Sequence, residues 1–367
     1  MKTQLTYIMV ILTISSYSFA QDNRLTLRNG QKIFASGMNL AWIEFGEDLT
    51  QFDEARFTRA LDELSAAGGN TVRWWLHVNG SHSPSFTQGK VSGLRPEEIP
   101  NLKKALDLAR VRGLVVVMVL WSFDMLRNQK GVNLENNLNL IEKVECTQAY
   151  IENALVPMVR ALKDHPAILC WEICNEPEGM SQEHGWTEVR TTKKSIQQFH
   201  NLIAGAIHRE APEALVCTGS WNIQVVSDLG KFENWYSDEK LIAAGGDSLG
   251  TLDFYQIHYY PRWYDEDYSP FHHPASYWQL DKPILIGEFP AKGLIDLGQG
   301  FRLKTPMSTQ DAYIYAYQNG YAGCLAWTWT GHDGHGGVQD VEPGMQFLKK
   351  RYPSDIIINF ERKVEHE

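Results

Sequence analysis

Features that this sequence lacks exclude several classes of protein. It has no cluster of basic residues, and its formal net charge is −10 over 367 residues, so nucleic acid and anionic membrane surfaces are poor partners for it. Beyond the first 20 residues it has no apolar run long enough to cross a bilayer, which takes about 20 residues as a helix. It also has no linker or low-complexity segment, so we expect a single globular domain.

Cysteine is scarce as well. The five are Cys146, Cys170, Cys174, Cys217 and Cys324, and an odd number leaves at least one unpaired in a monomer. Cys170 and Cys174 would lie about 13 Å apart on a strand that rises about 3.3 Å per residue, whereas disulfide-bonded Cα atoms lie within about 7 Å. We expect buried thiols, without a disulfide framework or a metal site.

The N-terminus has the three parts of a signal peptide. Lys2 supplies the positive end, Leu5–Ile14 is largely apolar, and Ser18 and Ala20 are small residues at the expected cleavage site. We expect cleavage after Ala20, which leaves residues 21–367 as the mature chain. The destination would be the periplasm, the cell surface or the medium.

Apolar runs alternate with helical patterns along the mature chain, which predicts a parallel sheet covered by helices. Eight such units in one domain favour a closed (β/α)8 TIM barrel. The expected strands are Lys32–Asn39, Thr71–Trp75, Leu114–Trp121, the run that ends at Asn175 within Ala167–Pro177, Ala214–Gly219, Leu252–Tyr259, Pro283–Phe289 and Cys324–Trp329. The expected helices are Phe52–Ala67, Pro100–Arg112, Cys146–Lys163, Thr187–Arg209, Trp235–Ala244, Thr309–Asn319 and Gly344–Arg351, and Ser81–Pro96 is expected to be a loop.

Two glutamates stand at the ends of expected strands. Glu176 ends the fourth strand and Glu288 ends the seventh, where TIM barrels carry their chemistry. Hydrolysis of a glycoside with retention needs one protonated and one ionised carboxyl about 5–5.5 Å apart. For Asn175 and Glu176 both to point into one site, the strand must bend or bulge at its end.

Five short motifs stand in order at the ends of strands two, four, six, seven and eight. They are Thr71-Val72-Arg73, Asn175-Glu176-Pro177, His258-Tyr259-Tyr260, Gly287-Glu288-Phe289 and Trp327. With them the chain resembles family 5 of the glycoside hydrolases, in the clan whose acid/base and nucleophile end strands four and seven. The resemblance covers essentially the whole mature chain and implies a retaining glycosidase without a cofactor.

The resemblance implies roles for the charged residues of these motifs. Glu176 would be the acid/base, with its pKa raised by an apolar wall so that it is protonated in the free enzyme. Glu288 would be the nucleophile, kept ionised by Arg73 and oriented by a hydrogen bond from Tyr260.

The remaining site residues would contact the sugar. Asn175 would bond the 2-hydroxyl, His258 would line the reacting subsite, and Trp327 would offer a flat apolar face, with Trp42 and Trp121 as further binding residues. A cleft walled by aromatic faces suits carbohydrate. Tryptophans that fall near expected strand ends are Trp42, Trp74, Trp75, Trp121, Trp221, Trp327 and Trp329.

One departure from the family pattern bears on the substrate. Many members carry a histidine at the end of strand three, where this chain reads Trp121-Ser122-Phe123-Asp124. We therefore expect a secreted, monomeric endo-β-1,4-glycanase acting on a plant-type polysaccharide, with mannan favoured over glucan or cellulose. An exo-acting β-glycosidase and a catalytically inactive carbohydrate-binding barrel remain as alternatives.

Two further groups of polar residues have structural interpretations. Glu172 lies deeper than Glu176 on the same strand, and we expect a buried carboxylate with a hydrogen-bonded partner. His332-Asp333-Gly334-His335 follows strand eight between glycines, which indicates an active-site loop rather than a metal site.

Overall fold

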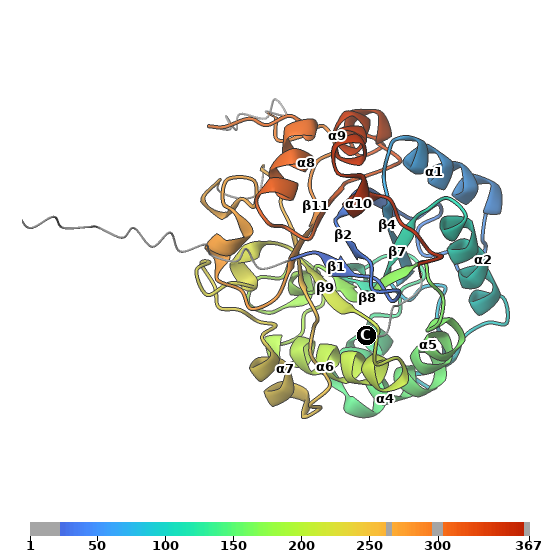
Figure 1. Ribbon diagram of the computed structural model, residues 1–367. Coiled ribbons are helices and arrows are strands. Elements are labelled where there is room, and N and C mark those ends of the chain that lie inside the picture. The colour runs from blue at the N-terminus through green and yellow to red at the C-terminus, as the bar shows by residue number, and fades with distance from the viewer. Residues whose placement is uncertain (1–22, 262–265, 296–303, 363–367) are drawn as a thin grey trace, which may run out of the picture.

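The computed structural model describes residues 23–261, 266–295 and 304–362 (Figure 1). The predicted signal peptide, residues 1–20, lies outside these ranges. No helix within them has the length and apolar character that a membrane crossing requires.

Eight parallel strands form a closed barrel, which confirms the predicted (β/α)8 architecture. Their order around the barrel is β3-β4-β7-β8-β9-β10-β11-β12. All their residues are buried except Ile168, as expected for strands covered on both faces. The strands are β3 Ala35–Ala41, β4 Thr71–Val78, β7 Val115–Ser122, β8 Ile168–Asn175, β9 Val216–Ser220, β10 Tyr255–His258, β11 Ile284–Glu288 and β12 Gly323–Ala326.

Helices surround this barrel (Figure 1). Side-chain caps fix several of their starts: Asp53 accepts a hydrogen bond from the Arg56 amide, and Thr192 accepts one from the Ser195 amide. The Thr192 cap explains why the helix that was predicted to begin at Thr187 begins at Lys193 instead. The helices are α1 Glu54–Ala66, α2 Glu98–Arg110, α3 Leu134–Glu142, α4 Val144–Tyr150, the π-helical turn η2 Ile151–Leu155, α5 Val156–Leu162, α6 Lys193–Glu210, α7 Asp238–Gly245, α8 Thr309–Gln318, α9 Val338–Arg351 and α10 Pro353–Ile356.

Several details differ from the prediction. The expected loop Ser81–Pro96 contains an antiparallel hairpin of β5 Ser85–Thr87 and β6 Lys90–Gly93, whose turn uses positive φ at Gln88 and Gly89. The hairpin is polar and short, so it lacks the apolar alternation that identifies a strand. Helix α3 was not predicted. The expected first strand divides into β2 Lys32–Ile33, which pairs with β1 Leu25–Thr26, and β3.

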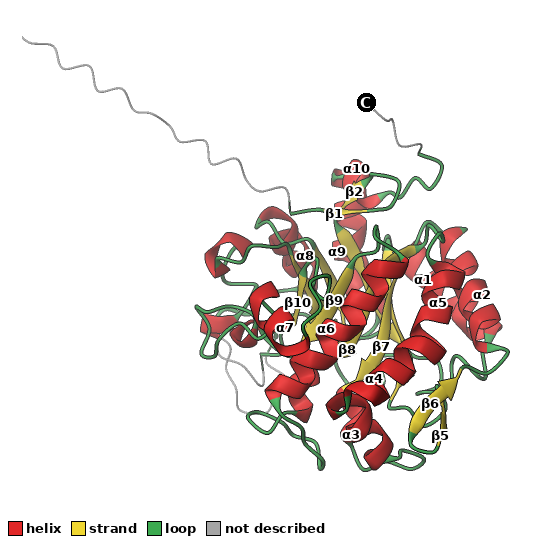
Figure 2. Cartoon of the chain, turned by 90° about the horizontal axis from the view of Figure 1, so that it is seen from below, coloured by secondary structure: helices red, strands yellow, loops and turns green. Residues whose placement is uncertain are grey.

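The ends of the barrel are distinct. Figure 2 shows β1, β2 and α10 at one end and the β5–β6 hairpin at the other. Leu25 and Ile33 belong to the same apolar cluster as Val117 and Leu285 from the strands, so the first hairpin closes the end where the strands begin. The opposite end, where the strands finish, carries the candidate site residues.

All five cysteines are buried and free, so their predicted burial is confirmed. Cys170 on β8 and Cys217 on β9 lie inside the barrel with their sulfur atoms 3.9 Å apart. They act there as small apolar side chains in the packing beneath the site.

Candidate active site

A cleft of about 890 Å³ lies at the carboxyl ends of the strands, where barrels carry their functional residues. Six of the nine predicted site residues line it, while Arg73 and His258 lie buried beneath it and Trp121 lies elsewhere. The lining residues are Trp42, Phe45, Trp75, Phe123, Asp124, Arg127, Gln129, Asn175, Glu176, Trp186, Trp221, Tyr260, Glu288, Trp327 and His335.

The end of β8 bends as the sequence requires. Its pairing with β9 shifts register between Glu172 and Asn175, and Glu176 follows in the left-handed conformation, with φ 45° and ψ 52°. The Glu176 amide donates to the carbonyl of Gly219, 2.6 Å away. A non-glycine residue in this conformation is strained by about 1–3 kcal/mol and such residues cluster at functional sites. The bend turns Asn175 and Glu176 toward the same cleft.

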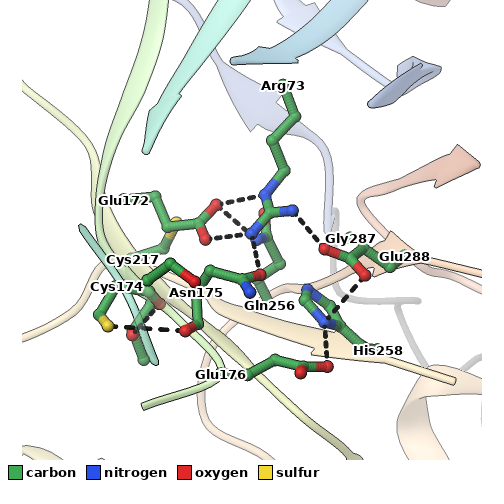
Figure 3. A network of polar contacts seen from close by, with 12 residues as sticks. Arg73, Glu172, Cys174, Asn175, Glu176, Cys217, Gln256, His258, Gly287 and Glu288 are labelled. Atoms are coloured by element: carbon green, nitrogen blue, oxygen red, sulfur yellow. Dashed lines mark hydrogen bonds and ion pairs between the residues drawn. The ribbon is translucent and has the colours of Figure 1, made fainter. Parts of the chain in front are cut away.

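His258 lies between the two glutamates (Figure 3). Its Nδ1 is 2.9 Å from Glu176 Oε1 and 3.4 Å from Glu288 Oε2. An oxygen of each carboxylate and the imidazole nitrogen all lie within 4.8 Å of one another. This spacing fits the retaining arrangement, about 5–5.5 Å, and is shorter than the roughly 6.5–9.5 Å of inverting enzymes. Within the described ranges, this trio is also the group with the spacing of metal ligands.

Arg73 connects Glu288 to a second carboxylate deeper in the barrel (Figure 3). Its Nη1 lies 2.6 Å from Glu288 Oε1, while its Nε and Nη2 donate to the two oxygens of Glu172. Gln256 Nε2 also donates to Glu172, at 2.6 Å. Both Arg73 and Glu172 are fully buried, so the expectation that Glu172 is a buried, partnered carboxylate is confirmed.

The same guanidinium orients the amide of Asn175. Arg73 Nη2 donates to Asn175 Oδ1 at 2.7 Å, and Nη1 donates to Asn39 Oδ1 at 2.8 Å. Because Oδ1 of Asn175 accepts this bond, its Nδ2 is left to donate toward the cleft.

The surroundings of the two glutamates differ in charge. Burial raises the pKa of Glu176 to about 7, and Asp124 and Glu172 add to the shift while Arg73 opposes it. Burial also raises the pKa of Glu288, but the charge of Arg73 and a hydrogen bond from Tyr260 oppose it there. Glu288 therefore touches a guanidinium and Glu176 does not, an asymmetry that favours a protonated Glu176 beside an ionised Glu288.

Tyr260 donates to Glu288, and His258 lies against both carboxylates. Tyr260 Oη donates to Glu288 Oε2 at 2.8 Å, and its pKa is raised by burial and by the neighbouring carboxylate, so the phenol keeps its proton. Burial lowers the pKa of His258 to about 4, so the ring is neutral at pH 7. Since no hydrogen-bond partner lies beside its Nε2 among the described residues, we place the single proton on Nδ1, facing the carboxylates.

Three tryptophans form one aromatic wall of the cleft. The ring centroids of Trp42, Trp75 and Trp327 lie 5.2–5.9 Å apart in edge or tilted contacts. Trp327 Nε1 donates to Asp333, in the loop after β12. His335 from this loop also lines the cleft, so the loop lies beside the candidate site, as predicted.

A second aromatic wall was not assigned from the sequence. Trp221, directly after β9, stacks on Trp186 with centroids 5.5 Å apart and an interplanar angle of 22°. Phe123 meets the ring of Trp186 edge-on at 5.3 Å. Trp221 stands near a strand end in the sequence, but Trp186 lies in a loop where no periodicity marks it.

Trp121 is not part of the cleft, contrary to the expectation. It is fully buried and packs against the rings of His77 and Tyr150, at 5.0 and 5.4 Å. The pairing of β4 with β7 shifts register so that Val78 faces Trp121, and the indole lies in the layer between barrel and helices. Phe123, two residues further on, lines the cleft instead.

Two other tryptophans near strand ends also lie outside this cleft. Trp74 is buried against Phe57 and donates from Nε1 to Asp48 at 2.8 Å. Trp329 lines an adjoining pocket of about 520 Å³ and donates to Glu63 at 2.8 Å. A position near a strand end is therefore not enough to predict that a tryptophan lines the cleft, because neighbouring residues on a strand point to opposite faces.

Asp124 belongs to the stretch Trp121–Asp124 at the end of strand three, where the sequence departs from the resembled family. It accepts hydrogen bonds from Ser122 Oγ at 2.7 Å and Gln129 Nε2 at 3.2 Å, and Arg127 lies 3.5 Å away. Burial raises its pKa. The cleft therefore carries a carboxyl group here, beside Glu176.

Comparisons with known proteins agree with this geometry. Residues 28–333 match the family model described as cellulase, glycosyl hydrolase family 5. A mannan endo-1,4-beta-mannosidase of Mytilus edulis is 34% identical over 348 residues, 88% of this chain and 90% of the relative. One from Cryptopygus antarcticus is 35% identical over 354 residues, 87% of each chain. The crystal structure of an endo-1,4-beta-mannanase from Eisenia fetida has a TM-score of 0.79 at 30% identity, covering 93% of this chain and 99% of that one.

Proposed function

The chain belongs to glycosyl hydrolase family 5 and is a glycoside hydrolase, and from that premise we propose that it is a retaining endo-β-1,4-mannanase. The substrate class rests on relatives that carry this activity and match most of the chain. It agrees with the weak preference for mannan that the altered strand three suggested. The acidic, aromatic-walled cleft suits a neutral polysaccharide.

The observation that carries the mechanism is the carboxylate pair at the mouth of the barrel. In the first step, a carboxylate oxygen of Glu288 attacks the anomeric carbon while Glu176 gives its proton to the glycosidic oxygen. The leaving part of the chain then departs as an alcohol. In the second step, the ionised Glu176 takes a proton from water. That water attacks the anomeric carbon and releases Glu288. The oxygen spacing within 4.8 Å supports this route.

The surrounding residues would each lower the barrier through a contact that they already make. Arg73 and Tyr260 keep Glu288 ionised and orient its carboxylate for attack on the anomeric carbon. The neutral His258 donates into the space between the carboxylates. Asn175, with its Oδ1 occupied by Arg73, would donate from Nδ2 to the sugar 2-hydroxyl, a bond that strengthens in the transition state.

Secretion and chain organisation belong to the same proposal. The charge, apolar core and small residues of positions 1–20 support a cleaved signal peptide, which would leave residues 21–367 as one catalytic domain that acts as a monomer.

Release of reducing sugar from a panel of polysaccharides tests the substrate. Mannan, glucomannan, cellulose, xylan and mixed-linkage glucan should be compared, with Glu288→Gln as the inactive control. We expect release from mannan and glucomannan with a range of oligosaccharide products. Binding without release from any of them would favour the inactive carbohydrate-binding barrel, and release of a single small product from chain ends would favour exo action.

A further inference from the structure

Glu178 is a buried carboxylate that double displacement does not use. It lies two residues after Glu176, in the short 3-10 turn η3 Pro177–Met180, and its exposed fraction is 0%. A carboxylate is rarely buried without a specific set of partners. Its partners therefore indicate what it does.

Each carboxylate oxygen of Glu178 accepts a hydrogen bond from a different segment of the chain. Oε1 accepts a hydrogen bond from Tyr236 Oη at 2.5 Å, and Oε2 accepts one from the backbone amide of Trp221 at 3.2 Å. Tyr236 is itself fully buried, and its amide is held by Asn234 Oδ1. Glu178 thus ties the turn after β8 to the first residue after β9 and to the segment before α7.

Trp221, whose amide donates to Glu178, forms part of the second aromatic wall, which we call the Trp186–Trp221 wall. Trp221 stacks on Trp186 and on His184, whose ring centroid lies 5.7 Å away at 19°. Gly179, next to Glu178, packs directly under Trp186, since a Cβ there would lie 2.6 Å from two atoms of the indole. The turn that follows Glu176 therefore sets both rings of the Trp186–Trp221 wall.

The two aromatic walls follow different strands of the barrel. Trp327 follows β12, and its amide donates to the carbonyl of Phe289, the neighbour of Glu288. Trp221 and Trp186 belong instead to the turns after β8 and β9, next to Glu176. Because the acid stands beside the leaving oxygen, the Trp186–Trp221 wall faces the departing part of the chain.

We propose that Glu178 is a positioning residue for the leaving side of the cleft. By fixing the backbone of Trp221 it holds the Trp186–Trp221 wall in place to bind the mannose units that depart. This inference rests on the proposed function. Glu178 acts through Trp221 and touches no substrate.

The test is Glu178→Gln, with Glu233→Gln as a matched control. Glutamine keeps the shape, but its single carbonyl oxygen can accept from only one of the two donors, Tyr236 Oη or the Trp221 amide, so the tie through residue 178 is weakened. Glu233 is an exposed glutamate that pairs with Lys193 and Lys240, so its change should leave kinetics unaltered.

Two substrates separate the leaving side from the rest of the site. Mannohexaose occupies both sides, whereas β-mannobiosyl fluoride has a one-atom leaving group and leaves the Trp186–Trp221 wall empty. For Glu178→Gln we expect KM for mannohexaose to rise by about tenfold, as loss of a buried acceptor allows, with kcat nearly unchanged. Values for the fluoride should match the unaltered enzyme.

A double-mutant cycle shows whether the effect passes through Trp221. Trp221→Ala should raise KM for mannohexaose, and adding Glu178→Gln to it should raise KM no further. If Glu178→Gln does not fold, Tyr236→Phe replaces it and should raise KM less, since the bond to Trp221 stays. Additive effects, or equal losses on both substrates, would overturn the inference.

The outcomes also separate this inference from the proposed function. If the unaltered enzyme cleaves no mannan, the proposed function fails and the cycle is run with oligosaccharides of whichever β-1,4-glycan it cleaves. If it cleaves mannan but the Glu178→Gln variant keeps the same KM for mannohexaose, only the role of Glu178 is contradicted.

Discussion

Exchange of Arg73 for lysine should raise the pKa of Glu288 and move the acidic limb of the pH–rate profile upward. Arg73 is fully buried, and its guanidinium pairs with Glu288 and Glu172 at once. A lysine ammonium lacks the planar fork and cannot serve both carboxylates. A charge-assisted hydrogen bond contributes about 1.5–3 kcal/mol, and one pKa unit corresponds to about 1.4 kcal/mol. We therefore expect the limb to move up by about 1–2 units.

Glu172→Gln is the matched variant, and we expect it to change the pKa of Glu288 in the opposite direction. It removes the charge that competes with Glu288 for Arg73, so the guanidinium acts more fully on Glu288 and lowers its pKa. The negative charge of Glu172 also raises the pKa of Glu176, so its loss should lower that pKa too. Both limbs of the profile should then move to lower pH.

The assay is kcat/KM for a manno-oligosaccharide across both limbs of the profile, because this ratio reports the pKa values of the free enzyme. Thermal unfolding should be recorded in parallel, since a broken buried ion pair costs about 3–5 kcal/mol. An acidic limb that stays in place in Arg73→Lys, or that moves the same way in both variants, would refute the electrostatic reasoning.

Three further predictions concern stability, binding and the thiols. The pKa of Glu176, raised by burial from 4.5 to about 7, means that the folded state retains a proton which the unfolded state releases. The free energy of unfolding should therefore fall between about pH 4.5 and 7 by up to about 3 kcal/mol, and denaturant unfolding of Glu176→Gln should show a shallower fall. Trp42→Ala should raise KM for mannohexaose with little change in melting temperature, whereas Trp121→Ala should lower the melting temperature by opening a cavity of the kind that costs about 3–5 kcal/mol. Thiol titration of the denatured, unreduced protein should find all five cysteines free, and two bridges would contradict the packing inside the barrel.

Most of the fold could be predicted because the barrel strands leave strong local signals. Runs such as Val115–Leu120 are continuous and β-branched, as strands buried on both faces must be. The ends of the helices were predicted less accurately, since a single capping residue such as Thr192 decides where a helix begins. The β5–β6 hairpin escaped prediction because its sequence is polar and short, and α3 because its nine residues are too short to show a clear helical period.

The centre of the site was predictable for a different reason. A glutamate that closes an apolar strand is brought to the mouth of a barrel by topology alone, so Glu176 and Glu288 could be placed together without knowledge of any loop. Arg73, His258 and Tyr260 were placed there by the resemblance to family 5 of the glycoside hydrolases, and Arg73 lies within β4 rather than at its end. The bend at Asn175 and Glu176 was required by alternation and is present.

The walls of the cleft could not be predicted in the same way. A register shift between β4 and β7 turned Trp121 into the outer core, and no sequence pattern marks such a shift. Trp186 and Glu178 depend on how the turns after β8 fold against those after β9. Those contacts join residues distant in sequence, so local reasoning does not reach them.

The central claim, that Glu176 is the acid/base and Glu288 the nucleophile, is tested most directly by the stereochemistry of azide rescue. Both alanine variants should be given a dinitrophenyl β-mannobioside, whose leaving group needs no proton. Glu176→Ala should still form the glycosyl-enzyme on Glu288 and then stall without a base. Azide needs no base, attacks that intermediate, and should give the β-glycosyl azide.

Glu288→Ala cannot form the intermediate, so azide can attack only from the face that the carboxylate left open and should give the α-glycosyl azide. The anomeric configuration of each product, read by nuclear magnetic resonance, decides the assignment. The account predicts the β-product from Glu176→Ala and the α-product from Glu288→Ala. The reverse pairing, or the same anomer from both, would contradict it.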